Sequence, residues 1–344
     1  MRRKGVCYDV GRVMQGRNWR PDFDPKVVHR ELEIIKNDLH CNAVRLQGLD
    51  LDRLVVAAED ALQQGLEVWF SPEMWDRDQE ETRAHVVKGA RRAEELRLRW
   101  PDRLVFSVGS EVTLFTQGFL PGTNVLERLA HPTLLETLRS GKHNPPLNAF
   151  LAATTSQVRE VFRGPVTYAS VGLETVDWAP FDIVGVDLYR EKRMRDFYPR
   201  LIERYKAFGK PVANMEFGCC TFKGAEALGG RGWDIIDWST RPPQLKGEYV
   251  YDQTTQAREV ADLLRVNDAA GVDATFVFTF VEPGAALQDE VERQMARELK
   301  FDPDIVRYSL VKTFPDGGHG STYPDLPWEP KESFRAVADY YAEH

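Results

Sequence analysis

Short apolar runs alternate with segments of helical periodicity along almost the whole chain. The runs are rich in β-branched and aromatic residues and therefore predict strands. Eight of them occur, at 5–10, 42–48, 66–72, 102–111, 164–170, 181–189, 210–218 and 273–283. Strands that are apolar along nearly their full length are typical of a parallel sheet covered on both faces. This alternation constrains the fold more than any other feature of the sequence.

Most of the apolar runs are followed by a segment that predicts a helix. In one of them Leu51, Leu54 and Leu62 share a face, and Gly65 is placed to end the helix. Other helices are expected near 28–39, 79–99, 147–162, 194–208, 254–270 and 332–341. After the fifth run the segment 171–180 has room only for a turn or a short helix. Eight such units in 344 residues favour a closed (β/α)8 TIM barrel, an α/β fold, over a doubly wound sheet.

The connections between these units differ in length in a regular way. Helix-to-strand connections are short, whereas long segments follow strand four (112–146), strand seven (218–252) and strand eight (281–330). Barrel enzymes build their active sites from the loops that leave the carboxyl ends of the strands. The extra residues therefore gather at the functional end. No internal repeat or linker divides the chain, and we expect one barrel domain over 1–344.

Charge and composition narrow the classes of partner. The formal net charge is −8, which gives no electrostatic reason to expect binding to nucleic acid or to an anionic membrane. No apolar stretch is long enough for a signal peptide or a transmembrane helix, so we expect a cytoplasmic protein. The four cysteines are expected to be reduced structural thiols, and the seven histidines lack ligand spacing. We expect no metal or cofactor, and the oligomeric state stays open.

Two glutamates stand where apolar strands should end. Glu111 closes the fourth run and Glu216 lies near the end of the seventh. Opposite strands of a closed barrel bring such residues to one cavity. A pair of carboxyl groups on either side of a bond suits glycosidic cleavage, because one protonates the leaving oxygen while the other attacks or activates water. Taken singly, either glutamate could equally form a salt bridge at the barrel rim.

The ordered set of motifs "VGSE", "ANMEFG", "NAVRLQG" and "VGVDLYR" resembles the clan A glycoside hydrolases, retaining (β/α)8-barrel enzymes that include cellulases, β-galactosidases and β-mannanases. The resemblance implies that Glu111 is the acid/base and Glu216 the nucleophile. It also implies that Arg45, on strand two, and Tyr189, at the end of strand six, contact the nucleophile. For a retaining enzyme the two carboxyl groups are expected about 5–5.5 Å apart.

The chain departs from the clan pattern in two places. Ser110 stands before the acid/base position, where the clan commonly has an asparagine that contacts the sugar. Strand eight offers Phe278 or Phe280, followed by Glu282, where the clan usually has a tryptophan. Both departures leave the nature of the substrate open.

Other residues near strand ends are candidates for substrate contact. They are the aromatic residues Trp75, Trp178, Trp233 and Phe280 and the acidic residues Asp9, Asp187 and Glu282. Each tryptophan could equally pack beneath a loop, and each aspartate could equally be structural.

The leading hypothesis is a retaining glycosidase or transglycosidase acting on a small-molecule or oligosaccharide substrate. A second hypothesis is a barrel hydrolase or lyase that uses the same glutamates on a non-sugar substrate, such as a secondary metabolite. A third is a non-catalytic binding protein on a glycosidase-like scaffold, against which the intact glutamate pair argues.

Overall fold

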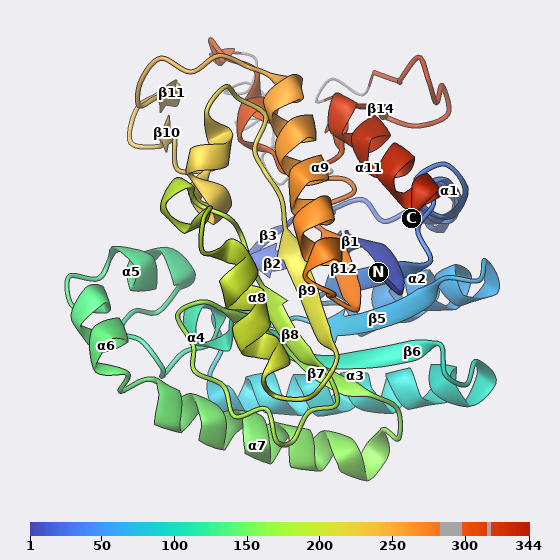
Figure 1. Ribbon diagram of the computed structural model, residues 1–344, viewed down its shortest axis with the longest axis vertical. Helices are drawn as coiled ribbons and strands as arrows, with labels where there is room; N and C mark the ends of the chain where they lie inside the picture. The colour runs from blue at the N-terminus through green and yellow to red at the C-terminus, as the bar shows by residue number, and fades with distance from the viewer. Residues whose placement is uncertain (283–297, 315–317) are drawn as a thin grey trace.

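Eight parallel strands close into a barrel in the computed structural model, which describes residues 1–282, 298–314 and 318–344 (Figure 1). The barrel strands are β1 (Arg3–Gly11), β4 (Ala43–Gly48), β5 (Glu67–Pro72), β6 (Leu104–Ser110), β7 (Val166–Val171), β8 (Val184–Asp187), β9 (Val212–Phe217) and β12 (Ala274–Val277). They follow one another around the barrel in chain order. The prediction of a (β/α)8 TIM barrel is confirmed.

The ring closes through β1, which pairs in parallel with strands on both sides. Gly5 lies opposite Ala43 of β4 and opposite Phe276 of β12. Almost every residue of the barrel strands is buried. This burial on both faces explains the unbroken apolar runs of the sequence, since the helices cover the outer face and side chains fill the interior.

Helices surround the barrel on the outside (Figure 1). They are α1 (Pro25–Asn37), α2 (Leu51–Gln63), α3 (Gln79–Arg99), α7 (Asn144–Val161), α8 (Tyr198–Lys206), α9 (Gln253–Ala269) and α11 (Glu332–Glu343). Four of these helices begin at an aspartate whose side chain accepts hydrogen bonds from backbone N–H groups of the first turn: Asp24, Asp50, Asp78 and Asp252. These caps fix where each loop from the barrel mouth turns into a helix.

The fifth unit has no helix between β7 and β8. Residues 172–183 form turns and bends, as the short segment in the sequence predicts. The backbone N–H of Asp182 donates to the carbonyl of Val166, which returns the chain to the amino end of the barrel beside β7. Trp178 lies in this returning segment.

The remaining short elements lie mostly in the segments that leave the carboxyl ends of the strands. They are β2 (Val13–Met14), β3 (Arg17–Asn18), α4 (Val112–Phe115), α5 (Val125–Ala130), α6 (Leu134–Ser140), η1 (Lys192–Met194), η2 (Ala225–Ala227), η3 (Gly229–Arg231), β10 (Ile236–Asp237), β11 (Gln244–Leu245), η4 (Pro303–Val306), β13 (Val311–Thr313) and β14 (Trp328–Pro330). In Figure 1, α5 and α6 extend away from the barrel at the left. Within the described ranges, no helix combines the length and apolar character that a bilayer span needs.

Candidate functional site

Glu216 lies in β9, where two donors reach its carboxylate. The hydroxyl of Tyr189 donates to Oε1 at 2.9 Å, and Nη1 of Arg45 lies 3.5 Å from Oε2. The Glu216 side chain is 14% exposed, while that of Arg45 is fully buried. The structure therefore brings Arg45 and Tyr189 to Glu216, as the sequence predicts.

Arg45 connects several groups in the barrel interior from its place in β4. Its Nη1 also donates to the carbonyl of Met215 at 2.9 Å and contacts Oδ1 of Asp187 at 3.3 Å. Its Nη2 lies 3.5 Å from Oε1 of Glu73. One buried guanidinium thus holds three carboxylates from three strand ends, because its fork of N–H donors can serve several acceptors.

Ser110 and Asp187 bind each other below the mouth. The Ser110 hydroxyl donates to Oδ2 of Asp187 at 2.8 Å. Burial raises the pKa of Asp187 well above its ordinary value, Arg45 acts in the opposite direction, and nearby Glu216 adds to the rise. Ser110 therefore uses its hydroxyl proton to bind Asp187.

Glu111 follows β6 in an unusual backbone conformation. The pairing of β6 with β7 shifts register between Ser107 and Ser110, and Gly109 has a φ of +150°. Glu111 itself has a φ of 46° and a ψ of 45°, the left-handed region that residues with a β-carbon rarely adopt. The shift ends the strand and turns the Glu111 backbone toward the short helix α4.

Hydrogen bonds on both sides hold this backbone in place. The N–H of Glu111 donates to the carbonyl of Ala169 at 2.8 Å, and its carbonyl accepts from Leu114 at 2.8 Å. The N–H of Val112 donates to the Tyr168 hydroxyl at 2.8 Å. Strain of this kind persists only where the surroundings fix it, and it is common at functional sites.

The Glu111 carboxyl group has a different environment from that of Glu216. Among the described residues it has no hydrogen-bond partner. Burial raises its pKa well above the ordinary value, and the negative charges of Asp187, Glu216 and Glu174 raise it further, against the lowering effect of Arg45. Glu111 therefore keeps its proton to a higher pH than an ordinary glutamate does.

Three further polar residues lie at the carboxyl ends of the adjacent strands β1, β4 and β5, and sequence reasoning missed all of them. They are Arg12, Gln47 and Glu73, which we call the Arg12 cluster. The amide nitrogen of Gln47 donates to Oε1 of Glu73 at 2.9 Å. Burial raises the pKa of Glu73, while Arg12 and Arg45 act to lower it. Glu73 contacts Arg45, the arginine that also holds Glu216, and Gln47 binds Glu73.

Arg12 is fixed by Asp9 and by aromatic rings. Its Nε donates to Oδ2 of Asp9 at 2.7 Å, and the other Asp9 oxygen accepts from the backbone N–H groups of Gly11 and Arg12. Asp9 thus orients Arg12 and has no free oxygen for substrate. The Arg12 guanidinium lies 5.0 Å from the ring of Trp19 and 5.3 Å from that of Trp75, within the range of a cation–π contact.

The aromatic residues at the mouth only partly match the sequence prediction. Trp75 is half-buried and stacks on Phe115 with ring centroids 4.2 Å apart. Phe278 lies 5.0 Å from the Arg12 guanidinium and packs against Tyr308. Tyr308 in turn packs against Tyr189, with centroids 5.5 Å apart.

Two predicted contact residues lie elsewhere, which corrects the sequence interpretation. Phe280 is fully buried and packs against Tyr8 and Trp328, so Phe278 is the strand-eight aromatic at the mouth. Trp178 is buried against Phe181 at the amino end of β8, away from the glutamates. Trp178 precedes its strand, and residues before a parallel strand lie at the opposite end of the barrel from those after it.

Glu282 and Trp233 occupy the segments around Tyr308. The Glu282 carboxylate accepts from the backbone N–H groups of Tyr308 and Ser309 at 3.0 and 3.2 Å, so it positions this segment. Trp233 is 37% exposed, and it follows Gly232, whose N–H donates to the Tyr308 hydroxyl at 3.0 Å. Trp233 is thus partly exposed next to a residue that contacts Tyr308.

Among the described residues, no group of three or more His, Cys, Asp and Glu side chains is arranged to hold a metal ion. All four cysteines are free and buried.

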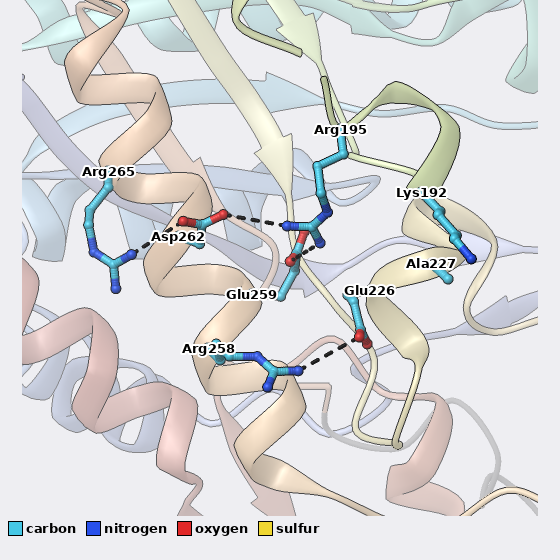
Figure 2. A pocket seen from close by; sticks show the side chains of 8 residues that line it. All are labelled: Lys192, Arg195, Glu226, Ala227, Arg258, Glu259, Asp262 and Arg265. Atoms are coloured by element: carbon cyan, nitrogen blue, oxygen red, sulfur yellow. Dashed lines mark hydrogen bonds and ion pairs between the residues drawn. The ribbon is translucent and has the colours of Figure 1, made fainter. Parts of the chain in front are cut away.

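A separate groove of about 600 Å³ lies outside the barrel, along α9 and the segments after β8 and β9 (Figure 2). Its charged residues mostly pair with one another, as Arg195 does with Glu259 and Arg258 with Glu226. Such mutual pairing is typical of a solvated surface. The glutamate site does not include this groove.

Comparisons with known proteins agree with this architecture. No protein-family model and no curated protein matches the chain. Among solved structures, a GH113 β-1,4-mannanase is similar with a TM-score of 0.63 and 16% identity over 100% of both chains. The GH113 β-mannanase from Alicyclobacillus acidocaldarius has a TM-score of 0.61 and 17% identity over 99% of this chain and 97% of its own.

A Bacteroides uniformis β-glucuronidase is also similar, with a TM-score of 0.57 and 14% identity. The match covers 99% of this chain but 35% of the glucuronidase, so the likeness is confined to one part of that larger protein. The chain thus has the (β/α)8-barrel fold that is found in these glycoside hydrolases.

Proposed function

We propose that this protein is a retaining glycoside hydrolase or transglycosidase in which Glu216 is the nucleophile and Glu111 the acid/base. The observation that carries the proposal is the unequal treatment of the two carboxyl groups. Glu216 is held by a cation and a hydroxyl donor, whereas Glu111 has no partner among the described residues and a raised pKa. A carboxyl group that donors hold in place suits attack, and one with a raised pKa suits proton donation.

In the first step Glu216 attacks the anomeric carbon, and the bond to the leaving oxygen breaks. Glu111 gives its proton to that oxygen, so the aglycone departs as a neutral alcohol. The products are a glycosyl ester on Glu216 and a carboxylate on Glu111. The negative charge forms on Glu111 in the same step in which the new bond consumes the negative charge of Glu216, so the pair carries one negative charge before and after the step.

In the second step Glu111 takes a proton from water while the water oxygen attacks the anomeric carbon. The ester bond breaks and the Glu216 carboxylate is restored, with Arg45 and Tyr189 again stabilising its charge. An acceptor alcohol in place of water gives transfer instead of hydrolysis. Both displacements invert the anomeric carbon, so the net result is retention.

The proposal is tested by trapping the ester. A panel of activated 2-deoxy-2-fluoro β-glycosides, both neutral and acidic, should inactivate the enzyme in a time-dependent way. Mass spectrometry of the digested protein should place the adduct on the peptide that contains Glu216. An adduct on another residue would reject Glu216 as the nucleophile.

Two independent measurements would test the stereochemical course. Proton NMR of the first-formed sugar should show the same anomer as the substrate, and the carboxyl groups of Glu111 and Glu216 are expected about 5–5.5 Å apart. Release of the opposite anomer would indicate inversion. Absence of both turnover and adduct across the panel would favour a non-sugar substrate or a binding function.

A further inference from the structure

Glu111 immediately precedes the first turn of α4, but its own carboxyl group does not cap that turn. A polar side chain at such a position commonly accepts a hydrogen bond from a backbone N–H group of the turn. Here the first two N–H groups bind other residues. That of Val112 donates to the hydroxyl of Tyr168 at 2.8 Å. That of Thr113 donates to Oε1 of Glu174 at 3.1 Å.

The Glu174 carboxyl group collects further donors. It accepts from the hydroxyl of Thr113 at 2.7 Å and from that of Tyr168 at 2.8 Å. It also accepts from the backbone N–H of Val171, the last residue of β7, at 3.3 Å. Burial raises the pKa of Glu174, and these donors act against the rise. Tyr168 and Glu174 thus form one hydrogen-bonded unit that joins the end of β7 to the start of α4.

The missing helix of the fifth unit explains how Glu174 reaches this place. The chain turns back directly after β7, and the N–H of Glu174 donates to the carbonyl of Val171 at 3.0 Å. On the other side, the N–H of Thr175 donates to the side chain of Asn144, the first residue of α7, at 2.7 Å. Two elements of the scaffold therefore hold the short segment that carries Glu174.

These bonds decide what the Glu111 carboxyl group can do. Val112 is 3% exposed and Thr113 is fully buried, so their N–H groups need an acceptor from the protein. Without Tyr168 and Glu174, the Glu111 carboxylate is the side chain placed to cap its own turn. A carboxylate that accepts backbone N–H bonds has a lowered pKa. Glu111 would then lose both its proton and its direction toward the leaving oxygen.

Glu174 also acts on Glu111 through its charge. Burial is the main cause of the raised pKa of Glu111, and the negative charges of Asp187, Glu216 and Glu174 add to it, while Arg45 opposes it. Glu174 therefore caps the turn in place of Glu111 and also helps Glu111 to keep its proton.

We propose that Tyr168 and Glu174 are positioning residues for the acid/base: they occupy the backbone donors next to Glu111 and so keep its carboxyl group available to the leaving oxygen. The proposal rests on the function proposed above and adds two residues to it. Both act through Glu111 rather than on the substrate.

The test compares two β-glycosides of the sugar that the wild type turns over fastest, one with a 2,4-dinitrophenyl and one with a phenyl leaving group. The first needs little protonation, whereas the second depends on the acid. We define the leaving-group ratio as kcat/KM for the dinitrophenyl glycoside divided by kcat/KM for the phenyl glycoside. In Glu174→Ala this ratio should rise about 10- to 100-fold, the effect of a slightly misplaced catalytic group. It does not depend on the fraction of folded enzyme, because both substrates are measured on the same preparation.

A double variant shows whether Glu174 acts through Glu111. Adding Glu174→Ala to Glu111→Ala should leave the leaving-group ratio at the value of Glu111→Ala, because the group to be positioned is already absent.

Tyr168→Phe tests the other half of the unit and does not require Glu174→Ala to fold. It removes the acceptor of the Val112 N–H and keeps the ring. Thr113 stays bound to Glu174, so the leaving-group ratio should rise by a smaller factor, about 3- to 10-fold.

Glu329→Ala is a matched control. Glu329 accepts from the backbone N–H groups of Ser321 and Thr322 at 2.7 and 3.1 Å and from the Thr322 hydroxyl. These are contacts of the same kind, in a segment that Tyr323 joins to the end of α1. Glu329→Ala should leave the leaving-group ratio unchanged.

The outcomes separate the two proposals. Equal losses on both glycosides in Glu174→Ala and Tyr168→Phe would overturn the positioning role while leaving the glycosidase function standing. A further rise of the ratio when Glu174→Ala is added to Glu111→Ala would do the same. A wild-type ratio in Glu111→Ala would reject Glu111 as the acid/base, and absence of turnover of every glycoside by the wild type would reject the proposed function; the positioning role falls with either.

Discussion

The ends of β6 and β9 carry the same side chain in opposite settings. Glu216 lies in β9, whose pairing with β8 and β12 also shifts register beside it, but its φ is not positive, and Arg45 and Tyr189 contact its carboxylate. Glu111 follows a register shift, has a left-handed backbone and lacks a partner among the described residues. The hydrogen-bond donors thus lie at Glu216, whereas the strained backbone lies at Glu111. The difference teaches that residue type sets only the capacity for acid–base chemistry, while the surroundings at each strand end set which donors and charges the carboxyl group meets.

The largest effect should follow from removing the carboxylate that the donors serve. Glu216→Ala is expected to lower kcat/KM for every glycoside by about 10⁴-fold or more, because no other group can form the ester. Steady-state kinetics on the purified variant checks this result. Glu226→Ala, in the outer groove, serves as the control and should retain activity. Substantial turnover by Glu216→Ala would show that Glu216 is not the nucleophile, and the contrast between the two strand ends would then have no catalytic meaning.

Glu111→Ala should give a loss that depends on the leaving group. A poor leaving group needs the proton, so kcat/KM for an unactivated glycoside should fall about 10²- to 10⁴-fold. A dinitrophenyl glycoside needs little protonation, and its first step should be nearly unaffected. Azide should then accelerate turnover by attacking the ester. Equal losses on both substrates without an azide response would contradict an acid/base role for Glu111.

The sequence predicts the barrel because its strands are apolar on both faces and its helices are not. It also predicts the glutamate pair, since a carboxylate at the end of an apolar strand is conspicuous. Glu73 directly follows the apolar run 66–72 and carries the same signal as Glu111, so it could have been found. Gln47 and Arg12 could not, because a neutral amide inside a strand and an arginine after a turn have many structural uses.

The prediction for Phe280 failed for a local geometric reason. Side chains alternate between faces only along a regular strand, and β12 ends at Val277. The direction of Phe278 and Phe280 therefore depended on the irregular backbone beyond that point. The function of Asp9 was hidden in the same way, because a tight turn brings Arg12 back onto its carboxylate.

The donor side of the comparison can be tested at Tyr189. Tyr189→Phe removes the hydroxyl that donates to Glu216 at 2.9 Å and leaves the ring packing intact. Losing a hydrogen bond to a charged group should lower kcat/KM about 10-fold or more. Tyr308→Phe is a matched control, because the Tyr308 hydroxyl bonds to the backbone of Gly229 and Gly232 and to the Cys220 side chain rather than to Glu216. Equal losses in the two variants would indicate a packing effect rather than stabilisation of Glu216.

The acid side can be tested through the pH profile. The raised pKa of Glu111 means that activity should fall as the pH rises through that pKa, because the acid loses its proton. The negative charge of Asp187 contributes to this rise. Asp187→Asn removes that charge and should move the alkaline limb of kcat/KM to lower pH, whatever its effect on the maximum rate. Glu174→Gln should move it in the same direction, and a shift to higher pH in either variant would contradict the assignment.

The smallest expected effect concerns the backbones alone. At position 111 a β-carbon in the left-handed region costs about 1–2 kcal/mol, while glycine adds about 0.4–1 kcal/mol of unfolded-state freedom. Glu111→Gly should therefore have a free energy of unfolding about 0.5–1 kcal/mol higher than that of Glu111→Ala. At position 216 the strand backbone has no positive φ, and Glu216→Gly should be less stable than Glu216→Ala by about 0.5–1 kcal/mol. The Gly and Ala variants at one position both lack the glutamate carboxyl group, so the difference in their free energies of unfolding comes from the main chain. Urea unfolding followed by circular dichroism measures the free energy of unfolding of all four variants. If the difference between the Gly and Ala variants has the same sign at both positions, backbone strain at Glu111 does not distinguish the two strand ends.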